Sequence, residues 1–115
     1  MSELQGIGRF RFHEAGTLEE FKRLSAQAME IVRAKDTGTM QYEIYCSDDQ
    51  SECIVLERYK DSEALLQHAA NLGELGAAIL ATGLVSSEIL GDPDAELEAK
   101  LADSSVRVFR PFLSM

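Results

Sequence analysis

The chain has 115 residues, 45% of them hydrophobic and 27% charged, which fits one soluble domain with a single core. Its 20 acidic and 11 basic residues give a net charge of -9, which argues against nucleic acid and anionic membrane surfaces as partners. No apolar run approaches the roughly 20 residues of a membrane-spanning helix, and the N-terminus has no signal-peptide pattern. We therefore expect a cytoplasmic protein with no nucleic-acid or membrane partner.

Alternating residues predict a first strand over residues 4–13. Phe10 and Phe12 share one face of this strand with two glycines. The other face carries Ile7, Arg9, Arg11 and His13.

A helix is predicted next. Thr17 and Glu20 have the spacing of a capping box, so we expect Thr17 to cap a helix that runs to about Lys35. Its apolar positions recur every three or four residues, which predicts one buried stripe. This stripe consists of Leu18, Phe21, Leu24, Ala28, Ile31 and Val32.

Two strands joined by a tight turn are predicted over residues 39–47 and 52–60. A loop of either two or four residues gives the same antiparallel register. The resulting pairs include Tyr42 with Glu57 and Cys46 with Cys53.

The rest of the chain predicts a helix, a strand, a short helix and a last strand. The helix begins at Asp61 or Ser62, and we expect a break at Gly73 and Gly76 because two glycines cost roughly 2 kcal/mol of helix propensity. The later elements are a strand over residues 84–90, a short helix with Pro93 at its first position and a strand over residues 106–113.

This order predicts an α+β fold, a ferredoxin-like antiparallel sheet with helices on one face, followed by an extra C-terminal helix and strand. We expect residues 1–115 to form one domain, with a core over about 4–91 and an extension over about 92–113. The central strands carry apolar side chains on both faces, whereas two helices cover only one face. A second copy of the sheet would cover the other, so we expect a homodimer.

The cysteines and histidines are too few for a structural metal site. Cys46 and Cys53 form no Cys-x-x-Cys motif, and His13 and His68 lie far apart in the sequence. Although the hairpin register brings the two thiols close enough for a bond, the cytoplasm keeps thiols reduced. We therefore expect two free cysteines side by side, which could form a reversible disulfide on oxidation. Phosphate-binding loops and the hydrolase Gly-x-Ser-x-Gly motif are also missing.

Three segments, in this order and spacing, resemble the antibiotic biosynthesis monooxygenase superfamily. They are Gly38–Tyr45, Val55–Tyr59 and Ala64–His68. They carry a Gly and a Tyr on one strand, Glu-x-aromatic at the end of the next, and a His on the following helix. The resemblance covers roughly residues 4–91.

This resemblance implies a dimeric α+β barrel and an oxygenase that uses no metal and no flavin. The substrate, a small aromatic phenol or quinol, would then supply the electrons to dioxygen. Where many members have Trp, this chain has Tyr59, and it contains no Trp at all. That departure disfavours haem degradation.

Two residues are candidate catalytic groups. An imidazole titrates near neutrality, so His68 could accept a phenol or quinol proton; alternatively, it is a hydrogen-bonded histidine at the rim of a cavity. Glu57 lies on a mostly apolar strand face, where a carboxylate needs a partner, and Tyr42 could donate a hydrogen bond to it. The alternative is a structural Glu–Tyr pair that sets the register.

The candidate substrate-binding residues are Phe10, Phe12, Tyr42, Tyr59, Asn71 and Arg11. The aromatic residues could instead belong to the core. Arg11 could bind an anionic substrate or pair with acidic groups across the sheet.

Two functions therefore remain open. The first is a cofactor-independent monooxygenase, and the second is a non-catalytic dimer of the same fold that binds a small ligand or serves a structural role. A cavity lined by His68, Tyr59 and Phe10 or Phe12 favours the first, and a collapsed core at these positions favours the second.

Overall fold

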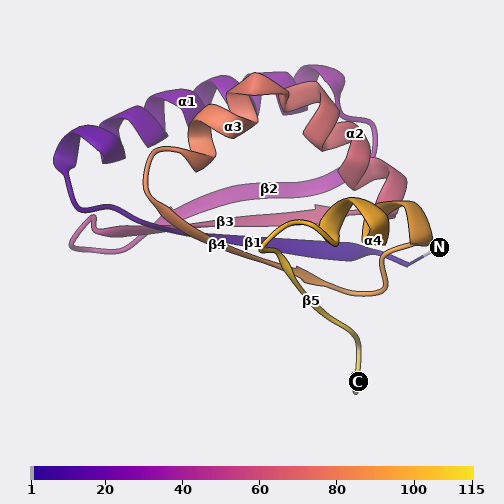
Figure 1. Cartoon of the computed structure of the whole chain (residues 1–115). Coiled ribbons are helices and arrows are strands. Elements are labelled where there is room, and N and C mark those ends of the chain that lie inside the picture. Colours follow the sequence, from indigo (N-terminus) through magenta and orange to yellow (C-terminus); the bar gives the residue numbers. More distant parts are fainter. Residues whose placement is uncertain (1) are drawn as a thin grey trace.

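In the computed structural model, which describes residues 2–115, five strands form one mixed sheet that carries helices on one face (Figure 1). The strands are β1 (Leu4–Arg11), β2 (Thr39–Cys46), β3 (Glu52–Tyr59), β4 (Leu84–Leu90) and β5 (Arg107–Phe109). The helices are α1 (Ala15–Lys35), α2 (Ser62–Leu72), α3 (Glu74–Leu80) and α4 (Ala95–Leu101). The ferredoxin-like fold predicted from the sequence is confirmed.

The strand order is β2-β3-β1-β4-β5, with β1 at the centre between β3 and β4. The first four strands are antiparallel to their neighbours, and β5 joins the edge of β4 in parallel. The predicted hairpin register is confirmed, because Tyr42 faces Glu57 and Cys46 faces Cys53.

The two opposed cysteines form a disulfide across the hairpin, with their Cα atoms 4.1 Å apart. The expectation of two free thiols is therefore wrong, although the register on which it depended is right. Cys46 and Cys53 face each other on neighbouring strands and project to the same face of the sheet, which brings their sulfur atoms together.

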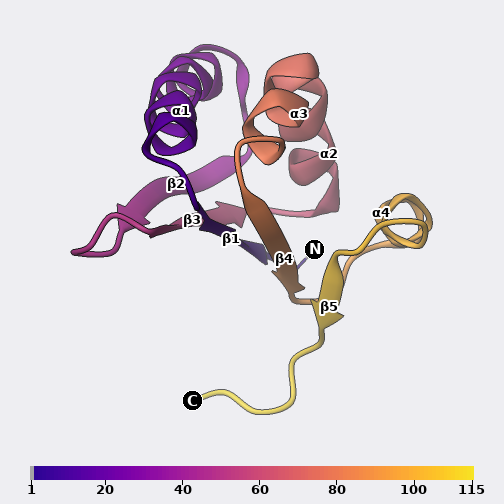
Figure 2. The same cartoon turned by 60° about the vertical axis from the view of Figure 1, so that its left-hand side comes forward.

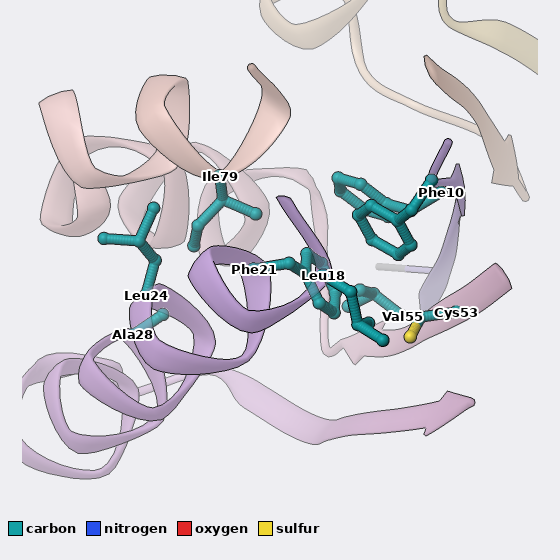
Figure 3. Packing of buried hydrophobic residues seen from close by; sticks show 9 residues of the cluster. Phe10, Leu18, Phe21, Leu24, Ala28, Cys53, Val55 and Ile79 are labelled. Carbon is teal, nitrogen blue, oxygen red and sulfur yellow. The ribbon is translucent and has the colours of Figure 1, made fainter. Parts of the chain in front are cut away.

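The main core lies between the sheet and helices α1 and α3 (Figure 3). Three phenylalanines pack at its centre, with the ring of Phe21 4.7 Å from that of Phe10 and 5.2 Å from that of Phe12. The other buried members are Leu18, Leu24, Ala28, Cys53, Val55 and Ile79. The predicted stripe of α1 thus faces the sheet, apart from the half-buried Ile31.

Two predicted helix starts are wrong. Thr17 does not cap α1, which begins at Ala15 with Glu14 at the N-cap position; the Thr17 hydroxyl lies inside the first turn and donates to the Glu14 carbonyl oxygen at 2.8 Å. Helix α4 begins at Ala95 rather than Pro93, because the Asp94 carboxylate caps it by accepting a hydrogen bond from the Leu97 amide.

The predicted break in the second helical region occurs at Gly73. Asp61 caps α2 as expected, since its carboxylate accepts a hydrogen bond from the Ala64 amide at 2.9 Å. At Gly73 the backbone has φ 50°, a conformation that favours glycine, and α3 begins at the next residue. Gly76 lies inside α3 and does not break it.

The last predicted strand is shorter than expected. Only Arg107–Phe109 forms β5, because this segment has one neighbour, β4, and pairs with just three of its residues. The chain beyond β5 extends past the sheet face that carries no helix (Figure 2), and its Phe112 and Leu113 side chains are 96% and 87% exposed.

The sheet face opposite the helices has an apolar centre. Ile7, Ile54 and Leu56 are half-buried there, on neighbouring strands β1 and β3. Polar pairs surround them, including Arg9 with Glu88 at 3.6 Å. Within residues 2–115, no helix is long and apolar enough to cross a membrane.

Candidate active site

A pocket of about 420 Å³ lies between the sheet and helices α2 and α3. This volume is within the usual range for sites that bind small molecules. Its apolar side chains include Phe10, Val55, Leu65, Leu72, Ile79, Leu80, Ile89, Leu101 and Val106. Its polar side chains include a group formed by Tyr42, Glu57, Tyr59 and His68, and Ser87 of β4 also lines it.

Two glycines of β1 leave space for this pocket. Gly6 and Gly8 belong to the strand face that also carries Phe10, which points toward the helices. A Cβ atom added at Gly6 would lie 3.7 Å from the Glu57 side chain, within ordinary contact. The pocket therefore exists partly because this stretch of the central strand has no side chains.

His68 is held in the site by a buried carboxylate. Its Nδ1 lies 2.7 Å from Oδ2 of Asp36, whose side chain is only 2% exposed. Because a carboxylate accepts, Nδ1 carries the proton, and Nε2 of the neutral ring is free to accept one. Asp36 also accepts hydrogen bonds from Thr39 Oγ1 at 2.7 Å and from Asn71 Nδ2 at 2.8 Å.

Glu57 lies on the other side of the imidazole. Its Oε1 atom is 3.8 Å from His68 Nε2 and accepts a hydrogen bond from the Tyr59 hydroxyl. The rings of Tyr42 and Tyr59 each meet the imidazole edge-on, with ring centres 5.3 Å apart. Side chains from α2, β2 and β3 thus form one connected polar group at the pocket.

The two carboxyl groups beside His68 differ in acidity. Burial opposes ionisation of Asp36, but the hydrogen bonds from Asn71, Thr39 and His68 outweigh it and hold the pKa of Asp36 below its ordinary value. Burial raises the pKa of Glu57, and the hydrogen bond from Tyr59 offsets this only in part. The site therefore combines an ionised carboxylate with a carboxyl group that holds its proton more tightly.

The tyrosines also hold their protons. Burial, together with the nearby charge of Glu57, raises the pKa of both Tyr42 and Tyr59. Both side chains are therefore hydroxyl groups at neutral pH, able to donate hydrogen bonds.

The structure brings five of the eight predicted site residues to this pocket. They are His68, Glu57, Tyr42, Tyr59 and Phe10. Tyr42 faces Glu57 as predicted, but the hydrogen bond to the carboxylate comes from Tyr59. Asn71 is not among the residues that line the pocket, but it donates a hydrogen bond to Asp36, which in turn holds His68.

The other two predicted residues lie elsewhere. Phe12 is in the phenylalanine core, beside Phe21. Arg11 is exposed on the opposite face of the sheet, where its guanidinium lies 4.0 Å from Glu52. This is the alternative considered for Arg11 from the sequence, a charge paired across the sheet.

No role for Asp36 was predicted from the sequence. One signal was available. An acidic residue at the C-terminal end of a helix is unfavourable, because it faces the negative end of the helix dipole. Asp36 caps α1 in that position, so another interaction must compensate.

No three His, Cys, Asp or Glu side chains among residues 2–115 are arranged to hold a metal ion.

The fold and the pocket define an α+β protein with a group of polar side chains, including His68 and Glu57, in a largely apolar pocket. The model of the antibiotic biosynthesis monooxygenase family matches residues 7–73, more than half of the chain. The chain belongs to this family. No curated protein matches it significantly.

Solved structures share the fold at low sequence identity. MupZ from Pseudomonas fluorescens is 22% identical and has a TM-score of 0.84, over 100% of this chain and 90% of MupZ. Rv0793 from Mycobacterium tuberculosis is 25% identical with a TM-score of 0.68, over 81% and 97% of the two chains. SnoaB, a cofactor-independent oxygenase from Streptomyces nogalater, is 16% identical with a TM-score of 0.66, over 83% and 97%.

Proposed function

We propose that the protein is a cofactor-independent monooxygenase that acts on a small aromatic phenol or quinol, with His68 as the proton acceptor. The observation that carries this proposal is the contact between His68 and Asp36. It fixes the proton on Nδ1 and leaves Nε2 as an acceptor beside an apolar pocket. The pocket also supports catalysis over a non-catalytic role, because the site is not a collapsed core.

The chemistry needs a substrate that becomes electron-rich when it loses a proton. His68 Nε2 takes the proton, and the charge of Asp36 stabilises the imidazolium that forms. The substrate anion then passes electrons to dioxygen. A ring CH₂ of an anthrone becomes a carbonyl, and the second oxygen atom leaves as water, so no external reductant is consumed.

The neighbouring residues have supporting roles in this scheme. Phe10, Tyr42 and Tyr59 pack against the aromatic substrate. Glu57, which keeps its proton more readily than an ordinary carboxyl group, returns a proton to the oxygenated intermediate.

We also propose that the protein is a homodimer formed through the sheet face that carries no helix. The apolar centre of this face, around Ile54 and Leu56, supports the proposal.

A second function, proton transfer without oxygen, is favoured by the two carboxyl groups. One is more acidic and the other less acidic than an ordinary carboxyl group, and such a pair can remove a proton from one atom and return it to another. This chemistry would also need no cofactor.

Oxygen uptake by the purified protein tests the proposal. With anthrone and 1,4-naphthalenediol as substrates, we expect uptake in which one oxygen atom from ¹⁸O₂ enters the product. The His68→Asn variant should be slower by about 10²-fold, while His13→Asn, a matched change at an exposed histidine outside the pocket, should keep its activity.

Two results would contradict the proposed monooxygenase activity. Exchange of substrate C–H for deuterium in D₂O without oxygen uptake would favour proton transfer alone. Tight binding of the substrates with neither exchange nor uptake would favour the non-catalytic ligand-binding role.

A further inference from the structure

The C-terminal extension forms one wall of the pocket. Helix α4 lies beside α2 and the N-terminal end of β1 (Figure 1). Leu101, the last residue of α4, and Val106, just before β5, both line the pocket. The family model ends at residue 73, so this wall stands outside the part of the chain that the family model matches.

The C-terminal extension that forms this wall is held in place by apolar packing and by hydrogen bonds at its two ends. Leu97 of α4 is 1% exposed and packs in a second apolar cluster with Leu4 and Ile89. The Asp94 amide donates a hydrogen bond to Ser62 Oγ at 2.9 Å, which joins the start of α4 to the start of α2. At the other end of the extension, Arg110 donates to Glu98 at 2.9 Å.

The charged residues around the pocket indicate that it disfavours anionic ligands. None of its lining residues in the described chain is Lys or Arg, and the acidic side chain that faces it is that of Glu57. Arg9 of β1 pairs with Glu88 on the opposite face of the sheet, so neither side chain faces the pocket. A ligand that carries a carboxylate or a phosphate would lose its hydration without gaining a cationic partner.

We infer that Leu101 and Val106 are specificity-determining residues that set the length of the neutral aromatic ligand this pocket accepts. The inference rests on the pocket being the ligand site of the proposed function, but not on its oxygen chemistry. These side chains line the pocket beside Leu65, so a larger side chain there should leave less room for the ligand and a smaller one more.

Binding of two fluorescent probes tests this inference without any turnover. The probes are 1-aminonaphthalene, with two rings, and 1-aminoanthracene, with three. We expect the wild type to bind both. Val106→Phe should weaken binding of the three-ring probe by about tenfold more than that of the two-ring probe. The matched control is Val108→Phe, the same change at a residue that packs on the second cluster but does not line the pocket.

A second pair of variants changes the pocket in the opposite direction. Leu101→Ala should improve the affinity for the three-ring probe relative to the two-ring probe. Leu66→Ala removes the same atoms from the same cluster outside the pocket lining, and should leave the ratio unchanged. Anthracene-1-carboxylate should bind at least tenfold more weakly than the neutral three-ring probe.

Several outcomes would overturn the inference. A wild type that binds neither neutral probe, or an unchanged probe ratio in both Val106→Phe and Leu101→Ala, would show that these residues do not limit the ligand. If Val108→Phe and Leu66→Ala change the ratio of probe affinities as much as the pocket variants do, the effect comes from the packing of the second apolar cluster and not from the pocket. Failure of the monooxygenase proposal alone would leave all these ratios as predicted.

Discussion

His68 of α2 lies 2.7 Å, from Nδ1 to Oδ2, from Asp36 at the C-terminal end of α1. The two residues are 32 positions apart in the sequence, so the packing of α1 against α2 decides where the imidazole proton sits. Substitutions in either helix that change this packing will therefore change the chemistry of the pocket.

Asp36→Asn should uncouple the imidazole from its fixed tautomer. An asparagine side chain can rotate to present its NH₂ group to Nδ1, which would then give up its proton to Nε2. The ¹⁵N NMR signals of His68 should show protonated Nδ1 in the neutral wild-type ring and a mixture of tautomers in the variant, together with slower turnover. Asp48→Asn, at an exposed turn, is the matched control. Identical ¹⁵N signals in Asp36→Asn and the wild type would refute a positioning role for Asp36.

Glu57→Gln should stabilise the fold increasingly as the pH rises. Burial raises the pKa of Glu57 above its ordinary value of 4.5, so the stability linked to its neutral form is complete below that pH and is lost as the pH rises through the folded-state pKa. The amide cannot ionise, so the variant escapes this loss.

Thermal unfolding at about pH 5 and about pH 8 measures the effect of Glu57→Gln. The gain in melting temperature over the wild type should be larger at the higher pH. Glu52→Gln, an exposed residue on the same strand, should show no such trend. A gain that shrinks with rising pH would mean that Glu57 is stabilised as a carboxylate.

The disulfide between Cys46 and Cys53 should contribute at most about 2 kcal/mol to stability, because it closes a short loop whose ends the hairpin already holds together. Alkylation of the unfolded protein should label no cysteine before reduction and two after it. Reduction should lower the melting temperature slightly without loss of helical circular dichroism. Two labelled thiols before reduction would contradict the disulfide.

The proposed dimer should sediment at micromolar concentration as a species of about 25 kDa, twice the 12.7 kDa of the chain. Leu56→Glu places a charge at the centre of the sheet face that carries no helix, and should produce monomers. Gln27→Glu adds the same charge on the exposed side of α1 and should leave the dimer intact. A wild type that sediments as a folded monomer would refute this interface.

The sheet could be predicted from the sequence because its signals are local. Alternation of apolar residues defines each strand, and the turn between β2 and β3 alone fixes which residues face one another, as with Tyr42 and Glu57. Strand β4 was predicted with its observed bounds for the same reason. The helix starts were less accurate, since Thr17 and Asp94 each belong to a run of residues that offers several caps.

The site could be predicted only in part, because its central contact is not local. Glu57 was recognisable as a carboxylate on an apolar strand face, and His68 through the family resemblance, but nothing in the sequence brings Asp36 to either of them. That contact depends on where two helices cross over the sheet. The disulfide illustrates a different gap: the register gave the geometry, whereas the expectation of free thiols came from a presumed compartment.

The absence of side chains at Gly6 and Gly8 also affects how the pocket behaves without a ligand. A cavity bordered by flexible side chains can close when they change rotamer, but here part of the space is bordered by the backbone of the central strand. Both neighbours of β1 hydrogen-bond to it along its length, so the strand cannot shift into the space without breaking the sheet. This part of the pocket is therefore preorganised, which lowers the energetic cost of opening space for a ligand.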